Sequence, residues 1–383
     1  MKNNICSSCF IEVLRDTSAY LHAGIKYYRG DDFKKGIDIS CKNIFWKFIG
    51  RCNKIFFNRL GFKIISRNMF DLDHWRSIYN WEEKIISINS ILTILTDPDI
   101  VNKVYSLIGN MNSKHTFIWL LKQRMSFALV GNISEIIYPH TLINSLSNNR
   151  TSSKRFITVN RKSYSILKIM DYEIICPRKS IESFYDTWVR EQYFLSRIFN
   201  PAGSSIVISA GAFVGETSIW LSRNLGKKGK VFAFEPAKEY FDILKLNIIN
   251  NNLSNTIYAN QIGLWHTHAT LRFIVDQTSS RCKKNGKVKI HAVSLDHFIE
   301  TNNIERVDYI KMDIEGAELN ALKGAIKTIT MFKPKLAISV YHKWDDIFTI
   351  PLFLHSIVPE YSFFFSHKKN YMKETILFAT CKN

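Results

Sequence analysis

The chain has 383 residues, which is more than one ordinary core of roughly 100–200 residues accommodates, so two domains are expected. Hydrophobic residues make up 46% and charged residues 22% of the chain, a balance that excludes a disordered protein. The formal charge of +19 favours anionic partners, but the basic residues are spread along the chain without an RNA-binding signature, which argues against nucleic acid.

The N-terminus lacks the features of an export signal. Charged residues interrupt residues 1–16 before an apolar signal-peptide core forms, and no run of about 18 apolar residues follows. The seven cysteines, an odd number, are scattered along the chain, which is typical of a reduced protein. We therefore expect a cytoplasmic location.

Residues 1–150 are expected to form a mainly helical region, because Gly and Pro are scarce and apolar residues recur every three or four positions. In residues 42–67, Lys47, Arg51 and Lys54 fall on one helical face and phenylalanines on the other. This pattern fits either a domain helix with a solvated basic face or a helix lying on an anionic membrane. The second interpretation would place the chain peripherally at the inner membrane face.

Two helices are expected within residues 97–138. Asp97-Pro98 is typical of a helix start, and Asn112-Ser113 predicts the cap of the second helix.

A linker is expected next, because residues 145–154 are polar and rich in Ser and Asn. The predicted domains are therefore an N-terminal region, 1–150, and a second domain, 160–383. Within the second domain, residues 163–177 alternate like a hairpin or edge strands, and residues 180–199 predict a helix.

Beyond Pro201, strand-like and helical segments alternate, as in a parallel sheet built from βαβ units. Helices are expected at residues 217–224 and 238–250. Strands are expected at residues 206–210, 230–234, 256–262, 307–312, 336–340, 361–366 and 375–380.

A glycine-bearing turn, SAGAFVGETS from Ser209 to Ser218, follows the first of these strands. Gly211 would let the backbone turn sharply close to a ligand, and Gly215 would let the next helix pack against the sheet. Glu235 ends the second strand about 20 residues later, where nucleotide-binding sheets place a carboxylate against ribose hydroxyls. A purely structural turn and a helix-start glutamate before Pro236 are the alternatives.

A third polar group follows the strand at residues 307–312. Asp313 and Glu315 come at its carboxyl end, where open α/β sheets bind ligands. Pairing with Lys311 or Lys323 is the structural alternative. Both acids could also be oxygen ligands of a metal, but further ligands are not evident, so no metal is assigned.

His342 follows the strand at residues 336–340 and is the first candidate for a general base, since its ordinary pKa suits proton transfer. Asp313 and Glu315 are the other candidates, and an exposed loop histidine is the alternative interpretation. His266, His268 and His291 lack partners at ligand-like spacing and are interpreted as surface or strand residues.

Together these motifs resemble the FkbM-type methyltransferases, which use S-adenosyl-L-methionine (SAM). The resemblance implies a Rossmann-like class I methyltransferase fold, α/β, with a mostly parallel seven-stranded sheet, helices on both faces and an antiparallel last strand. The mainly helical N-terminal region would precede it. The matching segments are GAFVGETS, VFAFEP, residues 247–252, GLW at 263–265, VSLDHFI, VDYIKMDIEGAELNALKGA, LAISVYHKWDD and ETILFAT.

The resemblance also implies that SAM is the cofactor and that Asp313 and Glu315 lie at the active-site edge. One departure is Ser209, which occupies a position where the family usually has an aspartate that helps to hold the methionine end of SAM. The residues expected at the cofactor are Ser209, Gly211, Ala212, Gly215, Glu216, Thr217, Glu235, Ile262 and Gly263.

The expected activity is methyl transfer to a hydroxyl of a sugar, glycan or lipid-linked glycolipid intermediate, as in polysaccharide biosynthesis. Ser209 leaves open a degenerate SAM-binding scaffold without catalysis, and an RNA or small-molecule methyltransferase also stays open. A nicotinamide-dependent dehydrogenase is disfavoured, because Gly211 and Gly215 form GxxxG where such enzymes have GxGxxG.

Overall fold

The computed structural model describes residues 9, 11–18, 89, 97–130, 155–195, 199–275, 281–282, 286–368 and 373–381. The basic segment 42–67 and the linker 145–154 lie outside these residues, so both remain predictions.

The chain divides into two compact units. The predicted domain boundary, between residues 1–150 and 160–383, stays a prediction. One unit comprises Met1–Lys103, Phe117–Thr141 and Asn370–Met372, and the other Val104–Thr116, Leu142–Lys369 and Lys373–Asn383.

Two helices occupy the described part of residues 97–138, as expected. They are α6 (Pro98–Leu107) and α7 (Met111–Val130). The predicted cap of the second helix is wrong, because Asn110 accepts the amide of Ser113 at 2.8 Å and the helix begins before Asn112. In the part of the chain that the structure describes, no helix combines the length and the apolar character needed to cross a membrane.

A three-stranded antiparallel sheet precedes the main sheet, which confirms the strands expected over residues 163–177. Its strands are β1 (Arg155–Val159), β2 (Lys162–Ile169) and β3 (Tyr172–Cys176), in the order β1-β2-β3. The side chain of Asn247 accepts the Ile175 amide at 2.8 Å and donates to the Ile175 carbonyl at 2.9 Å, which fixes β3 to the helix that carries Asn247.

The helix expected over residues 180–199 is shorter than predicted. It is α9 (Ile181–Trp188), after which the chain turns and Glu191 adopts a φ of 49°. The Lys368 ammonium donates to the carbonyls of Arg190, Glu191 and Phe194 at 2.7, 2.6 and 3.0 Å. A lysine distant in sequence thus satisfies carbonyls that a longer helix would have bonded internally.

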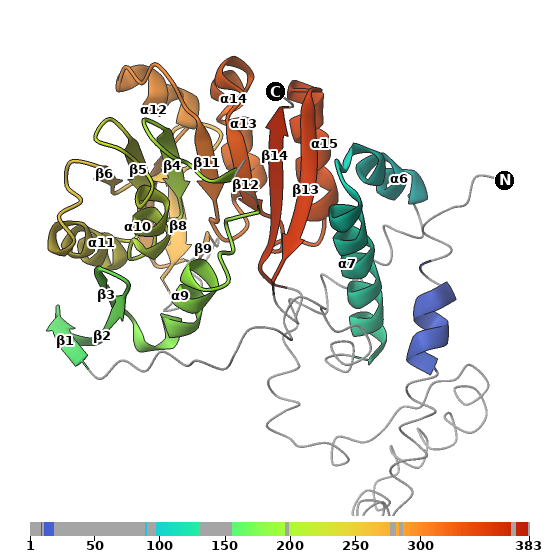
Figure 1. The fold of residues 1–383 in the computed structure, drawn as a ribbon, viewed down its shortest axis with the longest axis horizontal. Coiled ribbons are helices and arrows are strands. Elements are labelled where there is room, and N and C mark those ends of the chain that lie inside the picture. The colour runs from blue at the N-terminus through green and yellow to red at the C-terminus, as the bar shows by residue number, and fades with distance from the viewer. Residues whose placement is uncertain are drawn as a thin grey trace, which may run out of the picture. The chain divides into compact units, whose positions relative to one another are not determined.

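The main sheet has seven strands, as predicted (Figure 1). Their order is β13-β14-β12-β11-β4-β5-β6. Six of these strands are parallel to one another, and β14, the last in sequence, runs antiparallel to those six. The strands are β4 (Ile206–Ala210), β5 (Lys230–Phe234), β6 (Ile257–Asn260), β11 (Tyr309–Met312), β12 (Lys335–Ser339), β13 (Tyr361–His367) and β14 (Thr375–Cys381).

Helices cover both faces of this sheet (Figure 1). From β4 the chain moves through β5 to β6 and then returns to β11 on the other side of β4, so right-handed crossovers put the first and later helices on opposite faces. The first are α10 (Glu216–Ser222) and α11 (Lys238–Asn250), and the later ones are α12 (Leu295–Thr301), α13 (Glu318–Lys323), α14 (Ile326–Phe332) and α15 (Asp346–Ile357). This is the Rossmann-like class I fold that the resemblance implied.

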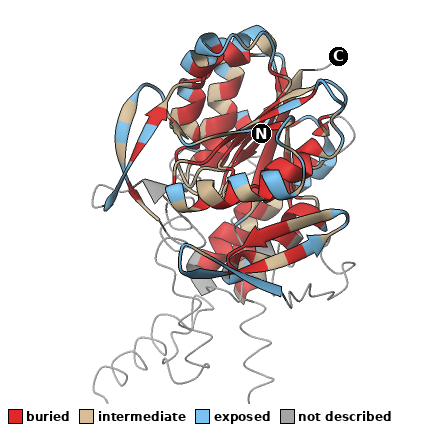
Figure 2. Ribbon diagram, turned by 90° about the vertical axis from the view of Figure 1, so that its left-hand side faces the viewer, coloured by how far each residue is buried: buried red, intermediate tan, exposed pale blue. Residues whose placement is uncertain are grey.

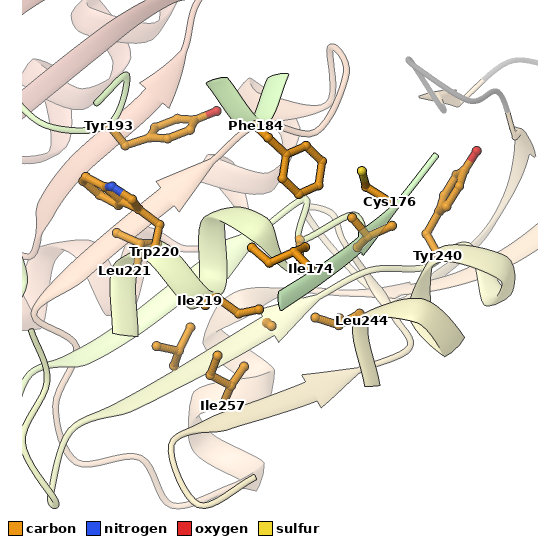
Figure 3. Close-up of a cluster of buried hydrophobic side chains, with 14 of the residues drawn as sticks. Ile174, Cys176, Phe184, Tyr193, Ile219, Trp220, Leu221, Tyr240, Leu244 and Ile257 are labelled. Atoms are coloured by element: carbon orange, nitrogen blue, oxygen red, sulfur yellow. The ribbon is translucent and has the colours of Figure 1, made fainter. Parts of the chain in front are cut away.

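A buried core joins the sheet to α9, α10 and α11 (Figures 2 and 3). Ile219 and Trp220 come from α10, Tyr240 and Leu244 from α11, and Ile174 from β3, and all five are buried. Burying an apolar side chain of this size contributes about 1.5–3 kcal/mol each, so this layer holds the first two βα units in place.

A third sheet, with four strands, was not predicted. Its strands are β7 (Gly263–Leu264), β8 (Ala269–Ile274), β9 (Arg281–Cys282) and β10 (Val288–Val293), in the order β7-β10-β8-β9. Ile290 and Ala292 face inward from β10 while Lys289 and His291 are exposed. β7 and β9 have two residues each, which is too short for any periodic pattern, whereas β10 does alternate apolar and polar residues and could have been predicted.

Candidate functional site

The carboxyl ends of three central strands meet at one edge of the sheet. Ala210 of β4 pairs with Met312 of β11, and Met312 pairs with Ile338 of β12. The segments that begin at Gly211 and Asp313 therefore leave the sheet side by side. Ligands of open α/β sheets bind at this edge.

The turn after β4 requires glycine at both predicted positions. A Cβ atom on Gly211, whose φ is 75°, would lie 1.7 Å from the Asp313 carbonyl oxygen. Gly215, with a φ of 97°, caps α10, and a Cβ atom there would lie 2.7 Å from Cδ1 of Leu244 in α11. Gly215 was predicted to let α10 pack against the sheet. The structure shows that it also lets α10 approach the neighbouring helix α11.

Glu235 fastens this glycine turn to the start of α11. Its Oε2 accepts the amide of Phe213 and its Oε1 accepts the amide of Ala237, both at 2.9 Å. Burial raises the pKa of Glu235 to about 7 although both hydrogen bonds oppose the shift. Each carboxylate oxygen keeps acceptor capacity for a further donor, such as a ribose hydroxyl.

Ser209 is fully buried, and its hydroxyl accepts a hydrogen bond from Ser218 of α10 at 2.9 Å. Lys311 pairs with Ser209 across β4 and β11 and is itself only 2% exposed. Its ammonium donates to the carbonyls of Ala210 and Gly211 at 3.3 and 2.9 Å. The buried ammonium of Lys311 thus bonds the carbonyls at the start of the glycine turn. Lys311 lies on the strand beside Ser209, the residue that stands where an aspartate was expected.

Glu216 and Thr217 begin α10 and are both buried. The Thr217 hydroxyl donates to Glu216 Oε1 at 3.2 Å, while Oε2 has no hydrogen-bond partner among the described residues. Burial raises the pKa of Glu216 to about 7, although the nearby Lys311 lowers it.

The remaining residues expected at the cofactor fall on the same side of the fold. Ala212 is buried in the glycine turn, and its amide donates to the Phe234 carbonyl at 2.9 Å. Ile262 and Gly263 are half-buried and follow the carboxyl end of β6. The chain thus carries all nine of these residues in β4 or in segments just beyond the carboxyl ends of β4, β5 and β6.

The structure brings His342, Asp313 and Glu315 together. Nε2 of His342 lies 3.5 Å from Asp313 Oδ1 and 3.4 Å from Glu315 Oε2. Nδ1 lies 2.9 Å from Oε1 of Glu318, a fully buried residue that the sequence analysis did not single out. The His342 side chain is 9% exposed, so it is not an exposed loop residue.

Burial and the neighbouring charges shift the pKa values of these three side chains. Burial alone would lower the pKa of His342, but the carboxylates of Glu318, Glu315 and Asp313 raise it to about 10. Burial, together with the neighbouring acids, raises the pKa of Glu315 to about 7. Burial would also raise the pKa of Asp313, but Lys311 and His342 together hold it below its ordinary value.

Two tyrosines complete the surroundings of Asp313. The Tyr193 hydroxyl donates to Asp313 Oδ2 at 2.7 Å, and the Tyr341 hydroxyl donates to Asp313 Oδ1 at 3.4 Å and to Glu374 Oε2 at 3.3 Å. Tyr341 could have been suspected because it precedes His342. Tyr193 could not, because 120 residues separate it from Asp313.

Among the residues that the structure describes, one group has side chains spaced for a metal ion, namely Asp313, Glu318 and His342. His266, His268 and His291 are exposed and lie outside this group, in agreement with their interpretation as surface or strand residues.

Comparison with known proteins gives consistent matches. Residues 209–377 match the profile of the methyltransferase FkbM domain. Methyltransferase sdnD of Sordaria araneosa is 25% identical over 210 residues, which cover 45% of this chain and 76% of that protein. Hexuronic acid methyltransferase AglP of Haloferax volcanii is 30% identical over 101 residues, which cover 25% of this chain and 41% of that protein.

A crystal structure of methyltransferase FkbM from Methylobacillus flagellatus is also similar, with 18% identity and a TM-score of 0.49. The match covers 75% of this chain and 60% of that chain. The present chain thus spans less than two thirds of both AglP and this crystallised protein.

Proposed function

Residues 209–377 carry an FkbM methyltransferase domain, and from this premise we propose that the chain uses SAM to methylate a hydroxyl of a sugar, glycan or glycolipid intermediate. One observation carries the proposal. The glycine turn at Gly211 and the polar cluster around Asp313 leave adjacent strands at the same sheet edge, and Gly211 contacts the Asp313 backbone. A cofactor at the turn would therefore lie next to the polar cluster.

The sugar acceptor is proposed because one relative, AglP, is named a hexuronic acid methyltransferase. The cluster suits such an acceptor, since carboxylates accept hydrogen bonds from hydroxyl groups. A lipid-linked sugar in polysaccharide synthesis would also agree with the positive charge of the chain, because such intermediates lie at a membrane surface.

In the proposed mechanism the protein mainly binds and aligns. SAM, when bound, supplies an activated methyl group on a sulfonium centre, so orientation is the main contribution of the protein. Glu235 would accept ribose hydroxyls with its remaining lone pairs. Glu315, whose pKa is raised to about 7, would receive the proton of the acceptor hydroxyl. Asp313 and His342 would orient that hydroxyl, since a pKa of about 10 keeps His342 protonated at neutral pH and makes it a donor rather than the predicted general base. The acceptor oxygen would lose its proton to Glu315 and gain the methyl group, so the transfer balances.

The cofactor site is tested by replacing Glu235 with Gln. The amide retains the shape but presents an N–H group to one of the two backbone amides it must bond, at Phe213 or Ala237. The neutral amide would also bind a ribose hydroxyl without charge assistance, and the loss of that contribution, about 1.5–3 kcal/mol, predicts SAM binding weakened by about 10–100-fold in calorimetry. Glu239→Gln, in the first turn of α11 and bonded to Lys162 and Tyr164, is the control and should leave the affinity unchanged.

The activity is tested with methyl-labelled SAM and lipid-linked or free hexuronic acid acceptors. Label in the sugar hydroxyl is the expected result. A second function, a SAM-binding scaffold without catalysis, is favoured by Ser209, whose hydroxyl bonds Ser218 and brings no charge. A melting temperature raised by SAM, without label in any acceptor, would support the scaffold. If SAM changes neither the melting temperature nor the label in the acceptor, both the methyltransferase and the scaffold are rejected.

A further inference from the structure

We propose that Tyr193 is a positioning residue of the active site and holds the carboxylate of Asp313 where it can orient the acceptor hydroxyl. This role rests on the proposed methyl transfer. Tyr193 lies on the turn that follows α9, outside residues 209–377, which match the FkbM domain. A segment that precedes the matched domain would thus complete its active site.

Tyr193 contacts Asp313 directly. The tyrosine is 3% exposed, and its hydroxyl donates to Oδ2 of the half-buried Asp313 at 2.7 Å. A hydroxyl bonded to a carboxylate at this distance forms one of the stronger hydrogen bonds in proteins. The bond occupies Oδ2 and leaves Oδ1 facing Nε2 of His342, which lies 3.5 Å away. The hydroxyl of Tyr193 therefore restricts the rotation of the carboxylate and fixes which oxygen faces the site.

The same bond favours the ionised form of Asp313. Burial would raise the pKa of this carboxyl group, but Lys311, His342 and the hydroxyl of Tyr193 together hold the pKa below its ordinary value. Since His342 is protonated at neutral pH, the ionised Asp313 attracts it. Asp313 and His342 thus keep one arrangement as a pair, and they are the two side chains proposed to orient the acceptor hydroxyl.

The backbone around Tyr193 is itself held by donors from distant segments. The ammonium of Lys368 donates to the carbonyls of Glu191 and Phe194, on either side of Tyr193, at 2.6 and 3.0 Å. The hydroxyl of Tyr309, in β11, donates to the carbonyl of Tyr193 at 3.1 Å. A side chain can position another group only when its own place is fixed, and these bonds fix the place of Tyr193.

Lys311 connects Tyr193 with the predicted cofactor site. Its ammonium lies 5.1 Å from the centroid of the Tyr193 ring and also donates to the carbonyls of Ala210 and Gly211. A cation over the face of an aromatic ring is attracted to that ring. The glycine turn and Tyr193 therefore contact the same buried ammonium, which links the cofactor side of the site to the acceptor side.

A second series of contacts joins Asp313 to the same turn. The hydroxyl of Tyr341 lies 3.4 Å from Asp313 Oδ1 and 3.3 Å from Glu374 Oε2. The side chain of Gln192 donates to Glu374 Oε2 at 2.5 Å. Gln192 precedes Tyr193 directly, so two adjacent residues of one turn hold Asp313 through both of its carboxylate oxygens.

A double-mutant cycle tests the role, with Tyr193→Phe and Asp313→Asn introduced singly and together into the full chain. Tyr193→Phe removes one hydroxyl and should lower kcat by about 10–100-fold, because Asp313 loses its fixed orientation. If Tyr193 acts through Asp313, adding Tyr193→Phe to Asp313→Asn should change kcat by less than about twofold. The affinity of Tyr193→Phe for SAM, measured by calorimetry, should stay within about twofold of the wild-type value.

Urea unfolding provides a readout that needs no turnover. Because the two side chains share one bond, the double variant should lose less stability than the sum of the losses in the single variants. Tyr164→Phe is the matched control, since Tyr164 is also 3% exposed and also donates to a carboxylate, Glu239 Oε1, at 3.0 Å. This variant should leave kcat unchanged.

Two results would overturn the role of Tyr193 while methyl transfer by the wild type retains the proposed function. One is an equal kcat in Tyr193→Phe and Tyr164→Phe. The other is the same fold-loss of kcat from Tyr193→Phe in the wild type and in Asp313→Asn, together with additive losses of stability. A wild-type chain that transfers no methyl group from SAM would instead overturn the proposed function, and the role of Tyr193 with it.

Discussion

At the scale of single residues, the site combines buried charges of both signs. Lys311 bonds a carbonyl of the glycine turn, and Glu235 accepts an amide of the same turn. Glu216 begins the helix that follows the turn, and Asp313 follows the neighbouring strand β11. Burial raises the pKa of each of the two glutamates to about 7, so their carboxyl groups are close to half-ionised at neutral pH. The free energy of unfolding should therefore depend on pH near pH 7.

Glu216 provides the pH prediction. Its pKa of about 7 in the folded state lies above the ordinary value of 4.5, so the folded state binds more protons between these values. The contribution of this proton to stability is lost as pH rises through 7. Glu216→Gln, which mimics the protonated form, should be near neutral at pH 5 and stabilising by about 1–3 kcal/mol at pH 8. Urea unfolding at both pH values measures this difference.

Glu239→Gln serves as the matched control, because Glu239 is partly exposed and paired with Lys162. An equal effect of Glu216→Gln at pH 5 and pH 8 would contradict the prediction.

At the scale of elements, side chains remote in sequence decide how segments join. Lys368 of the loop after β13 bonds three carbonyls after α9 and holds the turn that presents Tyr193 to Asp313. Asn247 of α11 bonds the backbone of Ile175 in β3 and also the Val214 carbonyl in the glycine turn, at 2.7 Å. One asparagine thus joins three segments around the expected cofactor site.

Asn247→Ala should therefore be strongly destabilising. It would leave the Ile175 amide, the Ile175 carbonyl and the Val214 carbonyl without their side-chain partner, and unsatisfied buried groups cost about 1–3 kcal/mol each. Allowing for relaxation, we expect a loss of about 2–5 kcal/mol in urea unfolding. Asn250→Ala, at an exposed position of the same helix, should change stability by less than about 0.5 kcal/mol, and similar losses in both variants would argue against the role of Asn247.

At the scale of the whole molecule, 52 basic residues against 33 acidic ones predict attraction to anionic surfaces. If the basic residues of segment 42–67 lie on a membrane, the chain should sediment with phosphatidylglycerol vesicles at low salt and be released as salt rises. Replacing Lys47, Arg51 and Lys54 by Glu should reduce this binding, while three matched replacements at Lys227, Lys228 and Lys230 should not. Equal sedimentation of both triple variants would reject the membrane role of the segment.

The sequence by itself determined the alternation of strands and helices after Pro201, the glycine turn and the acids at strand ends. These features depend on local periodicity and on backbone conformations that only glycine adopts, so they can be read from neighbouring residues. The four-stranded sheet was missed although β10 alternates, because the pairing of β10 with two-residue strands remote in sequence has no local signal. Helix α9 was predicted too long because Lys368, which bonds the carbonyls beyond its end, lies far away in sequence.

Only the tertiary structure decided what surrounds His342. The sheet order carries β11 and β12 to adjacent positions and so brings Asp313, Glu318 and His342 together, while the turn after α9 adds Tyr193. The pKa values of Asp313, Glu315 and His342 depend on burial and on distances of a few ångströms between remote segments. No local sequence pattern encodes those distances, because packing of the whole sheet sets them.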